Sequence, residues 1–287
     1  MSEIVNSCPL CGGQSRLFNR QKFHGREVIN RVCRYCGLVY QSPRMSESEA
    51  AEFYQAEYRQ VYQGDENPIA KDFTTQTARA ESLLGFVRTH IASAARHLDI
   101  GCSTGLVLQH FNKQYGCRPV GIDPGDAYRN YAGKQGLKVY RTLDELENAK
   151  EEKFDLISLA HVLEHLPDPV GYLTHLREAL LDPHGWLLLE VPNLYAHDSF
   201  EIAHLFSFSS HSLTQVLEKA GFEIVKLERH GRPRSQLLPL YIAVLAHPAA
   251  NRVYKLCPEK LVAFKRWAGM FRRRVLEHLL PGKAWLS

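Results

Sequence analysis

The stretch His97-Leu98-Asp99-Ile100-Gly101-Cys102-Ser103-Thr104-Gly105 decides the fold. An apolar run ends in two glycines four residues apart, and the helical segment Leu106–Tyr115 follows. Glycines let the backbone turn sharply and lie against a ligand, beside the exposed amides of a helix N-terminus. Leu106-Val107 replace the Lys-Ser/Thr of a phosphate loop, and the glycine spacing does not match Gly-x-Gly-x-x-Gly. The stretch therefore predicts a strand, a ligand-binding turn and a helix, without either of these two phosphate-binding motifs.

A carboxylate stands at the end of the next predicted strand, in Gly121-Ile122-Asp123-Pro124. At the carboxyl edge of a parallel sheet, Asp123 is placed to accept both ribose hydroxyls of a nucleoside. The glycine turn and this acid together predict an adenosine site without a pyrophosphate cradle.

Short apolar runs alternate with helical segments through most of the chain. The predicted strands are His97–Ile100, Pro119–Ile122, Leu137–Tyr140, Phe154–Leu159 and Trp186–Val191. The predicted helices are Asp72–Ile91, Leu106–Tyr115, Asp126–Gln135, Val170–Leu181 and Ser212–Ala220, and a capping box at Ser46–Glu49 opens another through about Tyr62. This alternation predicts a parallel, doubly wound sheet. Two last strands, Phe222–Glu228 and Leu238–Leu245, have too short a connection for a parallel crossover and are predicted to pair antiparallel.

Four of the seven cysteines form two Cys-x-x-Cys-Gly pairs. Two residues between thiols let one tight turn direct both sulfurs at one ion, and two such turns predict a closed structural zinc site. Its ligands would be Cys8, Cys11, Cys33 and Cys36. Two disulfides are the alternative, and the lack of a recognisable secretory signal in Met1–Cys8 favours reduced thiols. The residues Arg16–Val32 between the pairs are predicted to form a hairpin.

The ordered motifs strongly resemble those of the class I S-adenosylmethionine-dependent methyltransferases, over roughly residues 77–248. The matching segments are Leu98–Gly105, Gly121–Asp123, Phe154–Pro169, Gly185–Asn193 and His204–Ser209, followed by Leu213, Leu217 and Ala220–Phe222. The resemblance implies a Rossmann-like, seven-stranded sheet whose last strand is antiparallel, and S-adenosyl-L-methionine as the methyl donor.

The resemblance also assigns cofactor-binding residues. It places Asp99, Gly101, Cys102, Ser103 and Gly105 at the methionine end, Asp123 at the ribose, Pro124 with Thr142 and Leu143 near the adenine, and Ala160 and His161 beside the sulfonium.

Methyl transfer from a sulfonium is an in-line displacement, so the enzyme mainly aligns the acceptor and removes a proton where needed. Histidine is the usual base near neutral pH. The candidate catalytic residues are His161, His165 and His204, and His197 is expected at the same edge of the sheet. His165 could equally brace a helix start, and His204 could merely hydrogen-bond the turn that follows it.

A divalent cation is a further hypothesis for the same histidines. The spacing His161-x-x-Glu164-His165, with His204 approaching from a later loop, gathers imidazole and carboxylate ligands that could acidify an acceptor hydroxyl. The set resembles the metal-assisted arrangement of ubiquinone-pathway O-methyltransferases and small-RNA 2′-O-methyltransferases. Those families begin the motif with Glu, where this chain has His161.

Several acceptor classes remain open from the sequence. The first interpretation is O-methylation of a hydroxylated small molecule, such as a sugar, a glycan or a secondary metabolite. A four-cysteine module before such a domain also resembles sugar C-methyltransferases, but their His-Glu-His-x-x-Tyr-Phe-Ser motif is reduced here to His204 and Phe206-Ser207. An RNA- or protein-modifying methyltransferase is the other alternative. The sequence lacks the Asn/Asp-Pro-Pro-Tyr motif of amino-group methylation, which argues against a nucleic-acid partner.

The C-terminal tail carries the positive charge of the chain. The net charge is +4, while residues 251–287 hold nine basic and two acidic residues. An apolar stripe recurs there at helical spacing, through Leu261, Phe264, Ala268, Phe271, Val275 and Leu279. The pattern predicts a basic amphipathic helix. It would either pack its apolar face on the core or on a second copy, with the basic side in solvent, or dock on a membrane surface.

Composition bounds the remaining expectations. An apolar fraction of 45% and a charged fraction of 23% are those of a globular protein and exclude a disordered or fibrous one. No run reaches the roughly 18 to 20 apolar residues of a membrane span. We expect a zinc-binding module at 1–44, a helical linker or lid at 45–92, a methyltransferase core at 93–249 and the basic helix at 250–287. The protein is expected to be a cytoplasmic monomer or homodimer, with peripheral membrane contact as an option.

Overall fold

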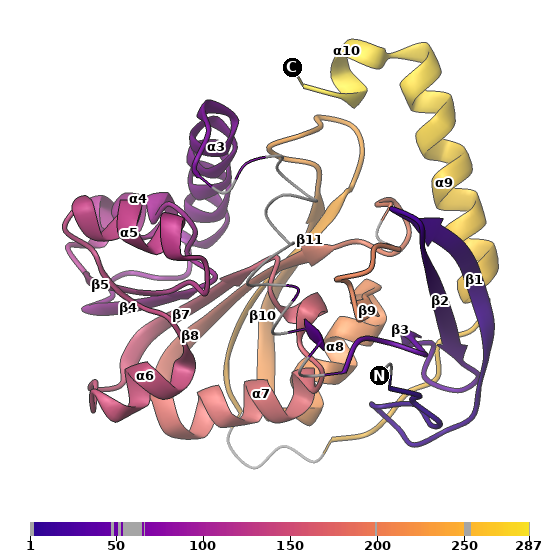
Figure 1. Ribbon diagram of the computed structural model, residues 1–287, viewed down its shortest axis with the longest axis horizontal. Coiled ribbons are helices and arrows are strands. Elements are labelled where there is room, and N and C mark those ends of the chain that lie inside the picture. The colour runs from indigo at the N-terminus through magenta and orange to yellow at the C-terminus, as the bar shows by residue number, and fades with distance from the viewer. Residues whose placement is uncertain are drawn as a thin grey trace.

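The structure is a computed structural model, and it describes residues 3–46, 49–50, 53, 65, 67–198, 200–249 and 254–286. A seven-stranded sheet with the order β10-β11-β8-β7-β4-β5-β6 forms its centre (Figure 1). Its strands are β4 (Arg96–Ile100), β5 (Arg118–Ile122), β6 (Lys138–Tyr140), β7 (Phe154–Ala160), β8 (Leu181–Pro192), β10 (Phe222–His230) and β11 (Tyr241–Pro248). β11 pairs antiparallel with both β8 and β10, whereas β4 to β8 pair in parallel. The predicted doubly wound sheet with an antiparallel last strand is confirmed.

Helices cover both faces of this sheet (Figure 1). They are α3 (Ala70–Val87), α4 (Leu106–Tyr115), α5 (Asp126–Lys134), α6 (Leu143–Asn148), α7 (Pro169–His175) and α8 (Ser210–Lys219). In β7, Leu156 lies in the buried cluster under α3 and α4, and the next residue, Ile157, lies in the cluster under α7 and α8. Successive side chains of a strand point to opposite faces, so a strand covered on both sides is apolar throughout.

The helix predicted at Val170–Leu181 is confirmed within one residue at each end, since α7 continues as a π-turn over Leu176–Leu180. The start of β8 was predicted wrongly, because the strand begins at Leu181 and not at Trp186. Regular pairing of β8 with β7 resumes only at Trp186, opposite Leu156, because the residues between form a bulge. β11 begins three residues later than predicted, since Leu238 and Leu240 lie in a separate apolar cluster with Ala284.

The first predicted helix lies mostly outside the described residues. Its capping box is described: the Ser46 amide donates to Glu49 Oε2 at 2.9 Å.

The cysteine pairs flank the predicted hairpin, which is confirmed. It consists of β1 (Ser15–Phe23) and β2 (Arg26–Cys33), paired antiparallel. Its sheet continues through β3 (Val39–Gln41) to β9 (Phe206–Ser207), a strand from the loop after β8. The N-terminal module is therefore joined to the central domain by backbone pairing of β3 with β9.

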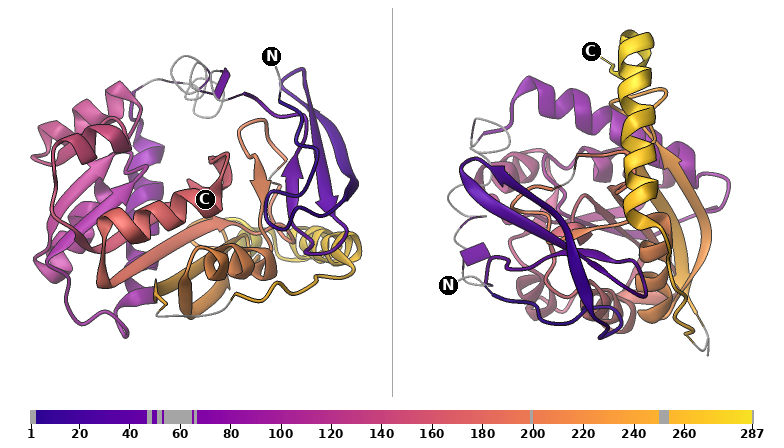
Figure 2. Two further views of the ribbon diagram at one scale, coloured as in Figure 1. Left: turned by 90° about the horizontal axis from the view of Figure 1, so that it is seen from below. Right: turned by 90° about the vertical axis from the view of Figure 1, so that its right-hand side faces the viewer.

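The basic tail forms α9 (Val262–Leu279) and the short α10 (Pro281–Ala284). Figure 2 shows α9 along the outside of the molecule, beside the β1–β2 hairpin. The predicted helix is present, but its expected orientation on the core was wrong. Arg266 and Arg273 point inward and donate to backbone carbonyls of the segment after β8, whereas Phe264, Trp267 and Phe271 are exposed. Among the described residues, no helix is long and apolar enough to cross a membrane.

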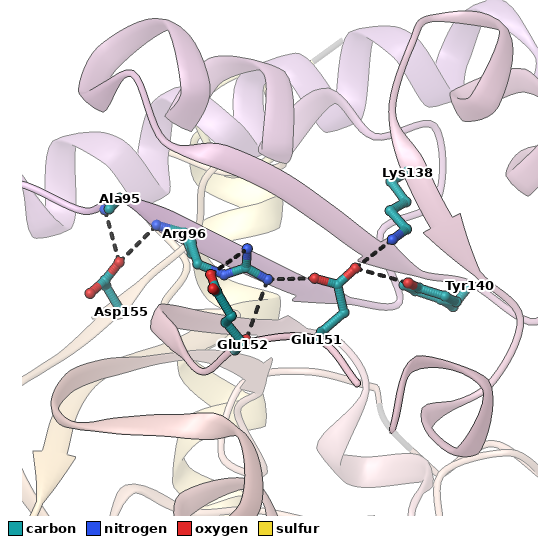
Figure 3. A network of polar contacts seen from close by, with 7 residues as sticks. All are labelled: Ala95, Arg96, Lys138, Tyr140, Glu151, Glu152 and Asp155. Carbon is teal, nitrogen blue, oxygen red and sulfur yellow. Dashed lines mark hydrogen bonds and ion pairs between the residues drawn. The ribbon is translucent and has the colours of Figure 1, made fainter. Parts of the chain in front are cut away.

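A polar network closes the sheet at the end opposite the glycine turn (Figure 3). Arg96 of β4 donates to Glu151 Oε2 at 2.5 Å, and the other Glu151 oxygen accepts from Lys138 and Tyr140 of β6. Asp155 accepts the amides of Ala95 and Arg96, at 2.9 and 2.7 Å. Burial alone would raise the pKa of Glu151, but its three donors outweigh burial and hold the pKa at about 2.

We expect Glu151→Gln to lower the free energy of unfolding by about 2 to 3 kcal/mol at pH 7. A carboxylate whose pKa is lower in the folded state stabilises the fold fully when the pH is above its unfolded-state pKa, near 4.5. This contribution disappears as the pH falls toward the folded-state pKa of about 2. The difference between the variant and the parent should therefore shrink between pH 4.5 and pH 2.

Urea unfolding at pH 7 and pH 3 measures this effect. Glu152→Gln is the matched control, because the Glu152 side chain is 82% exposed and its contact with Arg96, at 3.5 Å, is longer than that of Glu151. Equal destabilisation by the two substitutions would contradict the assignment.

Candidate functional site

A cavity of about 560 Å³ opens at the carboxyl edge of the parallel strands. Its walls come from the ends of β4, β5 and β7, from α3, and from the loops after β8 and β10. They include Arg79, Gly101, Ser103, Asp123, Pro124, Ala160, His161, His165, His197, Glu201, His204, Arg234 and Tyr241. One cavity thus joins the glycine turn and Asp123 to the candidate catalytic histidines.

At one end of the cavity, Asp123 is held by backbone amides. Its Oδ2 accepts from the Ser103 amide at 2.8 Å, and its Oδ1 accepts from the Gly125 amide at 2.9 Å. Ser103 and Gly101 both have positive φ, and a Cβ on Gly101 would lie 2.5 Å from Val162 Cγ2. The turn therefore requires glycine at position 101, and the two backbone amides fix the orientation of the carboxylate.

Six of the ten proposed cofactor positions line the cavity. They are Gly101, Ser103, Asp123, Pro124, Ala160 and His161.

Asp99, Cys102, Gly105 and Leu143 do not line the cavity. Asp99 is buried beneath the turn, where it accepts from Ser158 Oγ at 2.5 Å. Burial is the main cause that raises its pKa to about 7. Cys102 Sγ packs against Gly121, and Gly105 packs against Leu137. These residues shape the turn from behind.

The adenine-side positions also differ from the expectation. Leu143 packs against the apolar core, and Thr142 caps α6 by accepting from the Glu145 amide. Arg141 lines the cavity in their place.

The histidines lie at the other end of the cavity. Glu164 and His165 are brought together by the 3-10 turn η1 (Leu163–His165), and His204 approaches from the loop after β8. One ligand atom from each of these three residues lies within 4.8 Å of the others. His161 is not within this distance of all three, but its Nδ1 lies 3.4 Å from Glu164 Oε1.

The donor chemistry of these three residues fits a divalent cation. Both Glu164 carboxylate oxygens are buried and accept no hydrogen bond from the described residues. Burial opposes their charge, but the surrounding imidazoles outweigh burial and hold the pKa of Glu164 at about 2. The other ring nitrogen of His165, Nδ1, lies 2.9 Å from the Ala203 carbonyl, to which it donates in the tautomer that leaves Nε2 as a ligand.

His161 is instead part of a buried network centred on Glu190. Its Nε2 lies 3.0 Å from Glu190 Oε1, which also accepts from Arg79 Nε at 2.9 Å. The other Glu190 oxygen lies 3.2 Å from His230 Nε2. Burial and the nearby Arg79 oppose charging of His161, but the two neighbouring carboxylates prevail and raise its pKa. With carboxylates near both ring nitrogens, His161 is suited to carry a proton on each nitrogen and to keep a fixed ring orientation.

Sequence reasoning missed Arg79, Glu190, Arg234 and Tyr241. Glu190 left a signal, because it is a lone carboxylate inside the apolar run of a central strand, and a fully buried acid needs charged partners. Arg234 left none, since its place at the cavity depends on how the loop between β10 and β11 folds.

With this geometry in place, the chain can be compared with known proteins. Residues 73–227, more than half of the chain, match the protein family described as "Methyltransferase domain". The chain belongs to this family.

Relatives and solved structures agree with the methyltransferase domain. Ubiquinone biosynthesis O-methyltransferase of Dinoroseobacter shibae is 34% identical over 133 residues, which are 44% of this chain and 53% of the relative. The protein of the same name from Hahella chejuensis is 33% identical over 114 residues, 37% of this chain and 42% of the relative. The chain spans about half the length of the curated relatives it matches.

Among solved structures, Burkholderia thailandensis 1,6-didemethyltoxoflavin-N1-methyltransferase superposes with a TM-score of 0.59 at 20% identity, covering 81% of this chain and 100% of its own. A plantazolicin methyltransferase superposes with a TM-score of 0.51 at 14% identity, covering 70% of this chain and 94% of its own. At these identities the likeness shows the methyltransferase fold.

The four-cysteine module lies outside the matched methyltransferase domain and has the geometry of a metal site. Cys8 Sγ lies 3.5 Å from Cys36 Sγ, and Cys11 Sγ lies 3.4 Å from Cys33 Sγ. Disulfide sulfurs would be about 2 Å apart. Four thiolates at about 2.3 Å from one zinc ion would be about 3.8 Å from each other, close to the distances here. The alternative of two disulfides does not fit this arrangement.

The same module holds the loop of the methyltransferase domain that carries His204. Gln41 of β3 donates through Nε2 to the carbonyls of Glu201 and His204, at 2.5 and 2.7 Å. The Gln41 amide donates to the Leu205 carbonyl at 2.9 Å. The end of the cavity that carries His204 is therefore held in place by the N-terminal module.

Proposed function

We propose that this protein transfers the methyl group of S-adenosyl-L-methionine to a hydroxyl group of a small molecule. The cavity that joins Asp123 to His165 and His204 carries the proposal, with Glu164 buried beside the two histidines. One end offers a fixed carboxylate for ribose hydroxyls, and the other offers groups that bind or deprotonate an acceptor. The names of the relatives, which are O-methyltransferases, support oxygen as the acceptor atom.

The cofactor would lie across the carboxyl ends of β4 and β5. Asp123 would accept the ribose hydroxyls, Pro124 would lie against the adenine, and Gly101, Ser103 and Ala160 would border the methionine part. The N-terminal amides of α4 would supply hydrogen-bond donors for the carboxylate of the cofactor. His161 would lie near the sulfonium, with Glu190 setting its ring orientation.

The acceptor hydroxyl would lie toward His165 and His204. Either imidazole could take up its proton, and Glu164 between them would hold a positive charge formed there. A magnesium or manganese ion on Glu164, His165 and His204 would lower the pKa of a bound hydroxyl. Arg234 and Glu201 also line the cavity, so the acceptor would be a polar small molecule, such as a hydroxylated sugar or glycan.

A structural zinc ion bound by the four cysteines belongs to the same proposal. With four protein ligands the ion has no open coordination position, so it would act on folding and not on chemistry.

Asp123→Ala is expected to weaken the binding of S-adenosyl-L-methionine about 100-fold, because two hydrogen bonds to a charged group are lost. Isothermal titration calorimetry on the full chain measures this loss, and circular dichroism checks that the variant is folded.

The control is Asp126→Ala. Asp126 is three residues away, and its side chain is 70% exposed and paired with Arg129. Absence of binding to the parent protein would overturn the enzyme proposal, and unchanged binding by Asp123→Ala would overturn the assigned site.

A further inference from the structure

The outward face of α9 is a continuous apolar row. Phe264, Trp267, Phe271, Val275 and Leu279 recur every three or four residues, and their exposed fractions lie between 38% and 66%. The three aromatic rings stack in sequence, with centroids 5.8 Å apart at each step. A soluble domain rarely exposes a contiguous patch of this kind without a binding partner.

The helix cannot bury this row by turning on its axis, because its other face is fixed to the core. Arg266 donates to the carbonyls of Leu194 and His197, and its guanidinium lies 4.1 Å from the Phe200 ring centroid. Arg273 donates to the Ala196 carbonyl at 3.0 Å. A Cβ at Gly269 would collide with the backbone of Tyr195. The basic side chains thus anchor the helix, and the aromatic row is held outward.

The charges around the row are positive. Arg272 and Arg274 are exposed and lie on opposite sides of Phe271, about 100° and 60° away around the helix. The tail has two acidic residues, and both face inward: Glu259 is buried, and Glu277 accepts from Arg273 and Trp285. The outward face therefore combines an apolar row with cationic margins and no carboxylate.

This combination distinguishes between the occupants of the face. A second copy of the chain would bring the same arginines against each other without an acid to pair them, which costs free energy. A bilayer with anionic headgroups would pair with the arginines and accept the aromatic rings at the headgroup level.

We propose that α9 docks this face on the surface of a membrane that contains anionic lipids. The helix would lie parallel to the surface, with the aromatic row below the headgroups and Arg272 and Arg274 among the phosphates.

Docking here would place the acceptor side of the cavity near the membrane. The anchors of α9 are carbonyls of the segment 194–197, and His197 lines the cavity. In addition, the Leu286 amide donates to the carbonyl of Arg234, a second cavity residue. The proposal stands without the methyltransferase activity, since its test measures only binding.

Sedimentation of the full chain with vesicles tests the proposal. We expect the protein to bind vesicles of phosphatidylcholine and phosphatidylglycerol, and to bind phosphatidylcholine vesicles far more weakly. Phe264→Ser with Phe271→Ser should reduce binding about 100-fold or more, because two aromatic rings no longer leave water. Arg272→Gln with Arg274→Gln should reduce it about 30-fold. The fluorescence of Trp267 should shift to the blue on binding.

Leu17→Ser is the matched control, since Leu17 is an apolar residue of β1 with 54% exposure and lies outside the tail. It should bind as the parent does, and circular dichroism checks that each variant is folded. Failure of the parent to bind anionic vesicles at low salt would overturn the proposal. So would a dimer in light scattering that the Phe264 and Phe271 substitutions dissociate, since the row would then be covered by a second copy.

Discussion

Replacing Cys36 by serine is expected to unfold the four-cysteine module while the seven-stranded sheet stays folded. A structural zinc site contributes about 10 to 16 kcal/mol to the folding of a small module, and loss of one thiolate removes most of it. The hairpin strand β1 adds little to its stability, because the side chains of β1 are exposed or half-buried. Cys8, Cys33 and Cys36 themselves form part of its buried interior.

The consequence for the site follows from the pairing of β3 with β9. When β3 is no longer ordered, the loop that carries Glu201 and His204 loses the Gln41 side-chain donor and the Gln41 amide. A displacement of about 1 Å at a reacting group can cost about 100-fold in rate. We therefore expect hydrogen exchange of residues 200–208 to accelerate at least about 100-fold, and methyl transfer to fall with it.

The affinity for S-adenosyl-L-methionine should change little, because Asp123 and Ser103 contact no residue of the module in the hydrogen bonds described above. Hydrogen-exchange mass spectrometry, zinc analysis and calorimetry on the full chain measure the three effects. Cys257→Ser is the matched control, since Cys257 is exposed and lies outside the cluster. A Cys36→Ser protein that lacks zinc but keeps slow exchange at 200–208 would contradict the proposed coupling.

The sheet was predictable because its physical causes are local. A strand buried on both faces must be apolar, and a glycine turn before a helix marks its carboxyl end, so β4 and β5 were located within one residue. α4 begins and ends at the predicted residues, Leu106 and Tyr115, with glycines at both caps.

The orientation of α9 was not predictable from its periodicity. A hydrophobic stripe shows which residues share a face, but not which face meets the protein. Here backbone carbonyls at 194–197 accept hydrogen bonds from α9, and the long guanidinium side chains of Arg266 and Arg273 supply the donors, which a phenylalanine side chain lacks. Burial lowers the pKa of Arg266 to about 10, so the side chain stays charged while partly desolvated.

The candidate site was predictable only in part, for a related reason. The motif order located Asp123 and the histidines, since each follows a strand whose end lies at the same edge. The position of His161 depends on side-chain directions after β7, where it takes a positive φ and its Nδ1 lies 3.4 Å from Glu164 Oε1. His161 Nε2 then pairs with Glu190 Oε1, and a pairing between residues 29 positions apart cannot be predicted from local sequence.

Glu164→Gln is expected to lower the rate of methyl transfer on the order of 1000-fold while leaving the affinity for S-adenosyl-L-methionine nearly unchanged. The carboxylate is 1% exposed, and its oxygens face the imidazoles of His165 and His204. Glutamine keeps the shape but loses the charge that would hold a divalent cation or a protonated imidazole. Either loss removes several kcal/mol of transition-state stabilisation.

Chelation separates these two roles of Glu164. If the three residues hold a cation, a chelator should abolish activity in the parent, and magnesium or manganese should restore it, while metal analysis shows that the cysteine cluster retains its zinc. Glu178→Gln is the matched control, because this exposed carboxylate pairs with Arg177 outside the cavity. Activity that persists in chelator with the cysteine zinc retained would exclude the cation and leave Glu164 as a purely electrostatic partner of the imidazoles. Unchanged turnover of Glu164→Gln would show that Glu164 has no catalytic role. Its two buried oxygens accept no hydrogen bond from the described residues, and burial of such a carboxylate costs free energy. Without a catalytic role, nothing in the proposed mechanism would account for that cost.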